Sequence, residues 1–163
     1  MSKPSDYHPW VTFIYAREEA RRRGDRRVGT EHLVLGLVSE PAMAEVLGRD
    51  LPTARAALDA LDHDALVAVG LGEGLDAPPI PIRERTPRPT VRAVLKDRLP
   101  MTPAAMAAMK KASRDIRRGR RIPPERVMLA LVELEPPDPA YDLFVALGID
   151  RTELKQRLVV TSA

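Results

Sequence analysis

The tetrapeptide Gly29-Thr30-Glu31-His32 combines the residue types with the greatest chemical potential in this sequence. A threonine hydroxyl caps the start of a helix, and a glutamate in the first turn is favoured by the positive end of the helix dipole. Capping alone explains the pattern. The alternative is a recognition site, in which Glu31 binds a cation and the unpaired amides of the helix start bind an anion.

Catalytic and metal-binding residues show no supporting pattern elsewhere in the chain. His8, His32 and His63 lack the spacing of metal ligands, and there is no cysteine. The glycine-rich segment 70–74 lacks the preceding strand and the Gly-Lys-Ser/Thr of a phosphate-binding loop. We therefore predict a protein that is not an enzyme and has neither a cofactor nor a metal.

The composition points to a helical protein that lies in the cytoplasm. Hydrophobic residues make up 44% of the 163 residues but aromatic residues only 4%, so the core is expected to be aliphatic. No window approaches 18 uninterrupted apolar residues, and the first residues contain no apolar signal core. The absence of cysteine fits a reducing compartment. We expect no membrane contact.

An internal repeat organises the chain. Residues 28–38 and 122–132 share one apolar pattern, with glutamate at the same place in both. Residues 46–50 and 146–150 match in the same way around Gly48 and Gly148, and each is followed by an amphipathic stretch. A duplicated unit explains why these features occur in the same order.

The repeat predicts an all-α fold in which two pseudo-symmetric four-helix repeats pack into one eight-helix domain. We place the first repeat at 1–62 and the degenerate second repeat at 101–163. The Pro/Gly-rich residues 63–100 form a long linker, with room for one short helix at 90–98. In the second repeat, Thr102-Pro103 is a good helix start, and the first helix is expected to run from 103 to 118.

Two arginine clusters leave a second function open. One comprises Arg21, Arg22, Arg23, Arg26 and Arg27, and the other comprises Arg114, Arg117, Arg118, Arg120 and Arg121. Cations at the ends of helices are favoured by the helix dipole and remain solvated. The alternative is a basic, nucleic-acid-associated regulator, although the clusters contain no aromatic residues for base stacking. The formal net charge is only +3, far below that of a nucleic-acid-binding tail.

The segment 16–24, followed by 28–40, closely resembles the Clp amino-terminal domain, also called the Clp repeat domain, of ClpC and ClpA chaperones. The resemblance covers most of the chain except the linker, and it is stronger in the first repeat. The ATPase modules of that family are missing, so the chain resembles a stand-alone version. The resemblance implies a non-catalytic domain that receives substrates and adaptors for an unfoldase–protease.

The resemblance also implies ligand-binding residues. In ClpC-type members a glutamate of each repeat holds the guanidinium of phosphoarginine, and a threonine with helix-start amides holds its phosphate. The glutamates fall on Glu31, beside Thr30, and on Glu125. The threonines fall on Asp6 and on Thr102, so that Thr102 would share the second pocket with Glu125. Cyclic-peptide antibiotics bind between the repeats of similar domains, which corresponds to the helix start near Met101. The implied role is an adaptor or decoy that binds tagged proteins, Clp components or such antibiotics.

Overall fold

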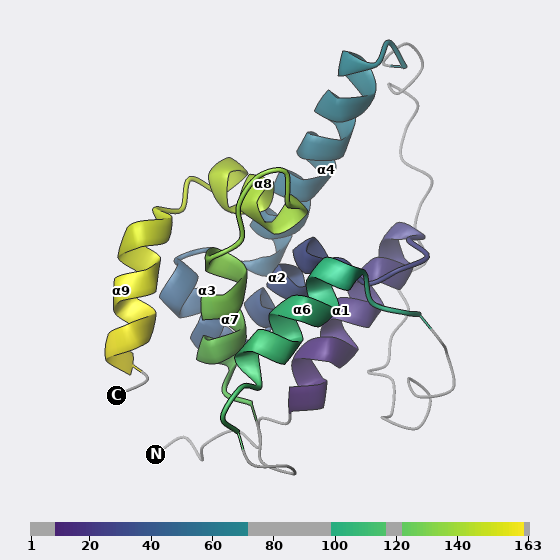
Figure 1. Ribbon diagram of the computed structural model, residues 1–163. Helices are drawn as coiled ribbons and strands as arrows, with labels where there is room; N and C mark the ends of the chain where they lie inside the picture. The colour runs from purple at the N-terminus through teal and green to yellow at the C-terminus, as the bar shows by residue number, and fades with distance from the viewer. Residues whose placement is uncertain (1–8, 72–98, 117–121, 162–163) are drawn as a thin grey trace.

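The computed structural model describes residues 9–71, 99–116 and 122–161, and these residues form eight helices (Figure 1). The first four are α1 (Pro9–Arg23), α2 (Thr30–Val38), α3 (Pro41–Leu47) and α4 (Leu51–Ala68). The second four are α6 (Pro103–Ala112), α7 (Pro124–Val132), α8 (Pro139–Ala146) and α9 (Arg151–Thr161). The described ranges contain no β-strand, so the predicted all-α class is confirmed.

The two sets of four helices repeat one plan. The α2 and α7 helices each contain 9 residues, and α3 and α8 contain 7 and 8. Both short helices are followed by a left-handed glycine, with φ of 62° at Gly48 and 63° at Gly148. Only glycine adopts this conformation without steric cost. The side chains of Asp50 and Asp150 then accept hydrogen bonds from amides at the start of α4 and α9.

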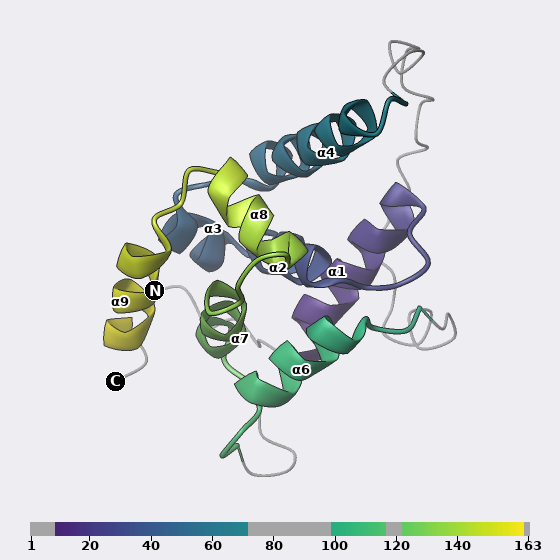
Figure 2. The same ribbon diagram turned by 45° about the horizontal axis from the view of Figure 1, so that its top comes forward.

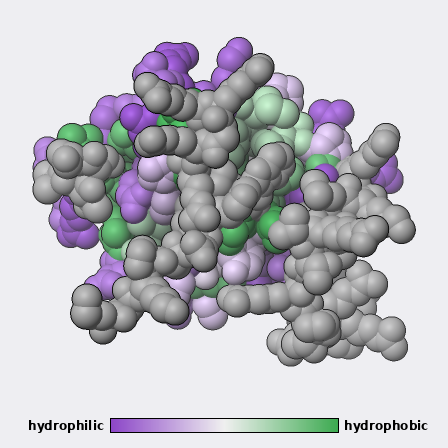
Figure 3. Space-filling view, turned by 90° about the horizontal axis from the view of Figure 1, so that it is seen from below, coloured by the Kyte–Doolittle hydropathy of each residue, from purple (hydrophilic) through white to green (hydrophobic). Residues whose placement is uncertain are grey.

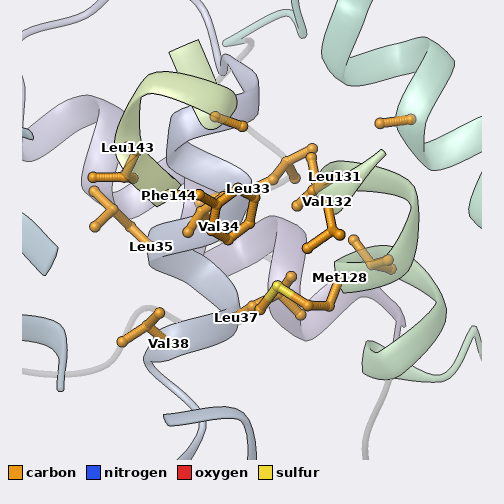
Figure 4. Packing of buried hydrophobic residues seen from close by; sticks show 14 of the residues in the cluster. Leu33, Val34, Leu35, Leu37, Val38, Met128, Leu131, Val132, Leu143 and Phe144 are labelled. Carbon is orange, nitrogen blue, oxygen red and sulfur yellow. The ribbon is translucent and has the colours of Figure 1, made fainter. Parts of the chain in front are cut away.

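The core is built around α2 and α7, the second helix of each repeat. Nearly every residue of α2 is buried, and α7 contributes Met128, Leu131 and Val132 (Figure 4). Phe144 of α8 enters the same cluster and is fully buried. The remaining core side chains are aliphatic, as the composition predicted. Burying two central helices from different repeats makes each repeat depend on the other for its apolar contacts.

The α1 and α2 helices cross very closely at Gly36. A Cβ atom added at Gly36 would lie 2.6 Å from the carbonyl oxygen of Thr12 and 2.9 Å from the amide nitrogen of Ala16. Thr12 and Ala16 are both fully buried. Glycine is therefore required at this position, because the backbone of α1 occupies the space of any side chain. The equivalent residue in the second repeat is Ala130, which is also buried.

Backbone and side-chain hydrogen bonds join the two repeats. Val28 and Met101 form an isolated parallel bridge, in which the amide of Val28 donates to Pro100 and that of Thr102 donates to Val28, both at 2.9 Å. At the opposite corner, the Nε of Arg49 donates to the carbonyl of Leu147 at 2.9 Å. The two backbone bonds fix the start of α6 beside the start of α2, and the bond of Arg49 joins the corner after α3 to the end of α8.

Two helix boundaries differ from the prediction. The α4 helix continues to Ala68 and projects from the body (Figure 2), so the boundary predicted after residue 62 falls inside a helix. The α6 helix ends at Ala112 instead of 118, because the hydroxyl of Ser113 bonds to the carbonyl of Lys110 and Asp115 adopts a positive φ of 67°. The short helix predicted at 90–98 lies outside the described residues.

Candidate ligand sites at the helix entrances

The start of α2, Gly29 to His32, is called here the first entrance. Gly29 is the N-cap residue, and the Nδ1 atom of His32 lies 3.0 Å from its amide nitrogen. The prediction that Thr30 caps this helix is wrong, since Thr30 is the first residue of α2 and its hydroxyl bonds elsewhere. His32 replaces it as the partner of the N-cap amide. This residue is almost fully buried, and its Nε2 lies 2.9 Å from a carboxylate oxygen of Asp25.

The carboxylate of Glu31 folds back over the helix start instead of pointing into solvent. Its side chain is 18% exposed, and its Oε1 lies 3.0 Å from Nδ1 of His32. Nδ1 donates to Glu31 when it carries a proton and accepts from Gly29 when it does not. Burial alone would raise the pKa of Glu31, but the hydrogen bond and charge of His32 outweigh burial and lower it. A Cβ on Gly29 would lie 2.2 Å from this carboxylate, so glycine makes room for it.

A second carboxylate reaches the first entrance from the other repeat. The hydroxyl of Thr30 donates to Oδ1 of Asp138 at 2.7 Å, and the same oxygen accepts from the amide of Ala140 at 2.9 Å. Asp138 is the N-cap residue of α8. The bridge between Val28 and Met101 brings the start of α6 to the same region. Three helix starts thus gather here, and the protein's own carboxylates take the place that an anion would otherwise occupy.

The start of α7, Pro123 to Arg126, forms the second entrance. Neither Pro123 nor Pro124 has an amide hydrogen, so this helix start offers two fewer donors to an anion. Glu125 lies in the first turn, and its charge acts on Glu40, the N-cap residue of α3. Burial and then the charge of Glu125 raise the pKa of Glu40 to about 7.

The two entrances occupy equivalent positions in the two repeats but differ in the hydrogen-bond donors that they offer. Asp138 and Glu40 are the N-cap residues of corresponding helices. Asp138 bonds to Thr30 of the other repeat, and Glu40 interacts electrostatically with Glu125 of the other repeat. At the first entrance the hydroxyl of Thr30 donates to Asp138. At the second entrance Pro124 stands in the place of Thr30 and has no donor. Neither Glu40 nor Glu125 forms an ion pair with a basic side chain of the described residues.

The Glu40→Gln substitution is expected to change the pH dependence of stability. The pKa of Glu40 is raised in the folded protein, so the protonated carboxyl contributes to the free energy of unfolding. This contribution is complete below the ordinary pKa near 4.5 and is lost as pH rises through about 7. The variant should therefore be more stable than the parent at pH 8, by about 1 kcal/mol once screening of a half-buried group is included. The advantage should shrink at pH 5.5. Urea unfolding at both pH values measures this, with Glu45→Gln as control. An equal effect at both pH values would contradict it.

The sequence-predicted residues divide between the two regions. Thr30, Glu31, Met101 and Thr102 lie together at the first entrance, where the Thr102 hydroxyl accepts from the amide of Ala105 at 3.2 Å and caps α6. No hydrogen bond or ion pair in the described part of the chain joins Thr102 to Glu125, which were expected to share a pocket. Asp6 lies outside the described residues.

Sequence reasoning missed the two acidic residues that interact with the entrances. Glu40 and Asp138 each precede a proline that begins a helix, in Glu40-Pro41 and Asp138-Pro139. An aspartate before a proline at the first helical position is a recognisable N-cap signal, which marks Asp138. Glu40 carries no such signal, since glutamate is not a preferred N-cap residue and its side chain forms no capping hydrogen bond. The interaction of both residues with the opposite repeat depends on tertiary packing and has no local signal.

Two arginines of the first cluster form ion pairs within the protein. Arg23 pairs with Asp25, Asp59 and Asp62, and Arg22 pairs with Glu19. Arg26 and Arg27 are exposed. In the second cluster, residues 117–121 lie outside the described residues. The face seen in Figure 3 mixes hydrophilic and apolar side chains. Internal ion pairing removes charge that a nucleic-acid interface would need, and it disfavours that alternative.

The described residues contain neither a metal site nor a membrane-spanning helix. No three histidine, aspartate or glutamate side chains of the described ranges gather in a way that could hold a metal ion. None of the described helices combines the length and apolarity required to cross a bilayer.

Comparison with solved structures identifies the fold. The crystal structure of the N-terminal domain of the caseinolytic protease-associated chaperone ClpD from Arabidopsis thaliana superimposes with a TM-score of 0.64. The match covers 95% of this chain and 94% of that chain at 19% sequence identity. This chain has the Clp amino-terminal domain fold. The expectation drawn from the first repeat is thus confirmed for the fold of the whole chain.

Sequence comparisons do not detect this similarity to the Clp amino-terminal domain. No family model matches the sequence, and no curated protein matches it.

Proposed function

We propose that this chain is a non-catalytic recognition module of a Clp-type protease system, which binds the arginine side chains of client or adaptor proteins at its second entrance. The fold supports the general role, since it matches a chaperone N-terminal domain. The observation that carries the ligand is the pair Glu40 and Glu125: burial and the charge of Glu125 raise the pKa of Glu40, and neither carboxylate has a basic partner among the described residues. A guanidinium between them would relieve their repulsion and form charge-assisted hydrogen bonds.

The second entrance favours unmodified arginine over phosphoarginine. The phosphate of phosphoarginine needs donors, and Pro123 and Pro124 supply none from their backbone nitrogens. Two carboxylates would also repel it. At the first entrance, Glu31 and Asp138 already occupy the helix starts. Phosphoarginine, which the family resemblance implies, is therefore the ligand to test against arginine. A cyclic-peptide antibiotic would instead be sought near Met101, which is half-buried in the bridge to Val28.

Calorimetry with matched peptides tests this proposal. Three peptides that contain arginine, phosphoarginine or citrulline at one position should bind with the arginine form tightest. Glu125→Gln should weaken arginine binding by about tenfold or more, since a hydrogen bond to a charged group contributes about 1.5–3 kcal/mol. Glu45→Gln, an exposed acid on α3, is the control and should leave affinity unchanged. Equal binding of all three peptides, or no heat with any, would reject the proposal.

The affinity for arginine is also expected to depend on pH. A bound guanidinium requires Glu40 to be ionised, and the pKa of Glu40 is about 7. Affinity should therefore rise between pH 5.5 and pH 8, with release of a proton on binding at the lower pH. Calorimetry in buffers of different ionisation enthalpy measures this proton. The dependence should disappear in Glu40→Gln.

Association with the Clp machinery is tested separately. Purified chain should retain a ClpC-type ATPase or its clients on an affinity column, and Glu125→Gln should retain less. A column that captures neither would reject the role in the Clp system without bearing on the intrinsic affinity for arginine.

A further inference from the structure

The end of α4 projects from the domain and exposes an apolar surface (Figure 2). Of the large hydrophobic side chains that are exposed in the described ranges, four lie close together in the sequence: Leu66, Val67, Val69 and Leu71. Their exposed fractions lie between 38% and 69%. Single exposed hydrophobic side chains are ordinary on a protein surface, whereas a contiguous group indicates a surface that another element covers.

This surface continues the face by which α4 packs on the body of the domain. Leu58, Leu61, Ala65 and Val69 recur at steps of three and four, which places them on one side of the helix. Leu58 is buried and Leu61 is half-buried, but every residue from 62 to 71 is exposed. The apolar face therefore extends about two turns beyond the part that the body covers.

The uncovered part of this face is called here the α4 stripe, and it comprises Leu61, Ala65, Leu66 and Val69.

Acidic residues accompany the α4 stripe. Asp59, Asp62 and Asp64 lie in this part of the helix, and residues 56–71 contain no lysine or arginine. Arg23 of α1 pairs with Asp59 and Asp62, whereas Asp64 forms no ion pair with a described residue. Two copies of α4 packed on each other would bring these like charges together. The charge therefore favours a basic occupant over a second copy of the helix.

The sequence between the repeats contains an occupant with these properties. Segment 90–98, which lies outside the described residues, has three basic residues and one acidic residue. Val94 and Leu95 follow Val91 by three and four positions, which is the spacing of one helical face. The segment thus combines the apolar side chains and the positive charge that the α4 stripe and its aspartates require.

The residue that follows segment 90–98 is anchored near α4. The carbonyl of Leu99 accepts a hydrogen bond from Arg17 of α1 at 3.1 Å. Six residues later in the same helix, or about 9 Å along its axis, Arg23 pairs with aspartates of α4. Nine residues rise about 13 Å in a helix, so segment 90–98 is long enough to reach the α4 stripe from Leu99.

We propose that segment 90–98 of this chain packs on the α4 stripe as an amphipathic helix. Its apolar side chains cover Leu66 and its neighbours, and its basic side chains face the aspartates of α4. This contact attaches the sequence between the repeats to the first repeat and removes the exposed apolar surface from water. The surface lies on the projecting end of α4 and involves neither entrance, so the proposal does not depend on the proposed function.

Paramagnetic relaxation measures where segment 90–98 lies. The chain contains no cysteine, so Ala93→Cys carries a nitroxide at one defined position. The amide signals of residues 62–69 in the same isotope-labelled chain should lose most of their intensity and regain it when the nitroxide is reduced. Unchanged signals at 62–69 would overturn the proposal.

A mixed sample separates one chain from two. An isotope-labelled chain without cysteine is combined with an unlabelled chain that carries the nitroxide, and the signals of residues 62–69 should keep their intensity. A loss of intensity in this sample would place a second copy on the α4 stripe and would overturn the assignment to the same chain.

Two variants with matched controls separate packing from mere proximity. In the nitroxide-labelled chain, Leu66→Lys puts a cation on the α4 stripe opposite a basic segment and should restore most of the lost intensity. Ala60→Lys puts the same charge on the opposite, exposed side of α4 and should leave the loss unchanged. Leu95→Asp should also restore the signals, with Thr86→Asp outside the segment as its control. A loss that persists in both Leu66→Lys and Leu95→Asp would contradict packing on the stripe.

Discussion

Replacing Gly36 with alanine is expected to destabilise the protein by about 2 kcal/mol or more, although alanine is the better helix former. Alanine would gain roughly 1 kcal/mol in helix propensity. The new Cβ would lie 2.6 Å from the carbonyl oxygen of Thr12, however, and α1 would have to move away from α2. Overpacking of this kind costs about 1 to 3 kcal/mol and sometimes more. Because the obstructing atoms belong to the backbone of α1, no side-chain rotation relieves the contact.

Chemical denaturation of Gly36→Ala and of a reference variant measures this effect. Ala60→Gly, at an exposed position of α4, is the reference and should lose about 1 kcal/mol through propensity alone. The two substitutions exchange the same residues in opposite directions, so propensity predicts effects of opposite sign. A gain in stability for Gly36→Ala would show that α1 and α2 do not approach closely at this point.

Removing the contact between Thr30 and Asp138 is expected to cost about 2 kcal/mol. Thr30 is 1% exposed, and its hydroxyl bonds to a carboxylate at 2.7 Å. Thr30→Val keeps the shape but leaves Asp138 without this donor, and hydrogen bonds to charged groups contribute about 1.5–3 kcal/mol. Asp138→Ala should cost a similar amount, since it also removes the cap of α8.

A double-mutant cycle isolates the contact between the repeats. The free energies of unfolding of the two single variants and the double variant should give a coupling of about 1 to 2 kcal/mol. Thr152→Val, at an exposed position of α9, is the control for the loss of a threonine hydroxyl. Additive effects of Thr30→Val and Asp138→Ala would mean that the two side chains do not stabilise one another.

The fold was predictable because local signals agreed with the repeat. Gly48 and Gly148 marked helix ends, and Asp50 and Asp150 marked the next helix starts, in both repeats. The length of α6 was not predictable in this way. The apolar spacing continues to Ile116, but local hydrogen bonding by Ser113 and the positive φ of Asp115 end the helix earlier. The spacing of apolar residues indicates which side chains face the core, but it does not indicate where the helix ends.

The candidate sites were predictable only in part. The sequence located Glu31 and Glu125 at matching helix starts, and both lie in the first turn of their helices. It could not show that Glu31 folds back onto His32, since this depends on the space left by Gly29. Nor could it show that Glu40 and Asp138 interact with residues of the opposite repeat. These contacts join residues distant in sequence, and no local pattern encodes them.

The bridge between Val28 and Met101 affects how the chain folds. It joins residues 73 positions apart, and the central helices α2 and α7 also come from different repeats. Contacts of such long range form only after a large loop has closed, so neither repeat gains its full stabilisation early. Folding is therefore cooperative over both repeats, and the pair behaves as one unit instead of two exchangeable modules.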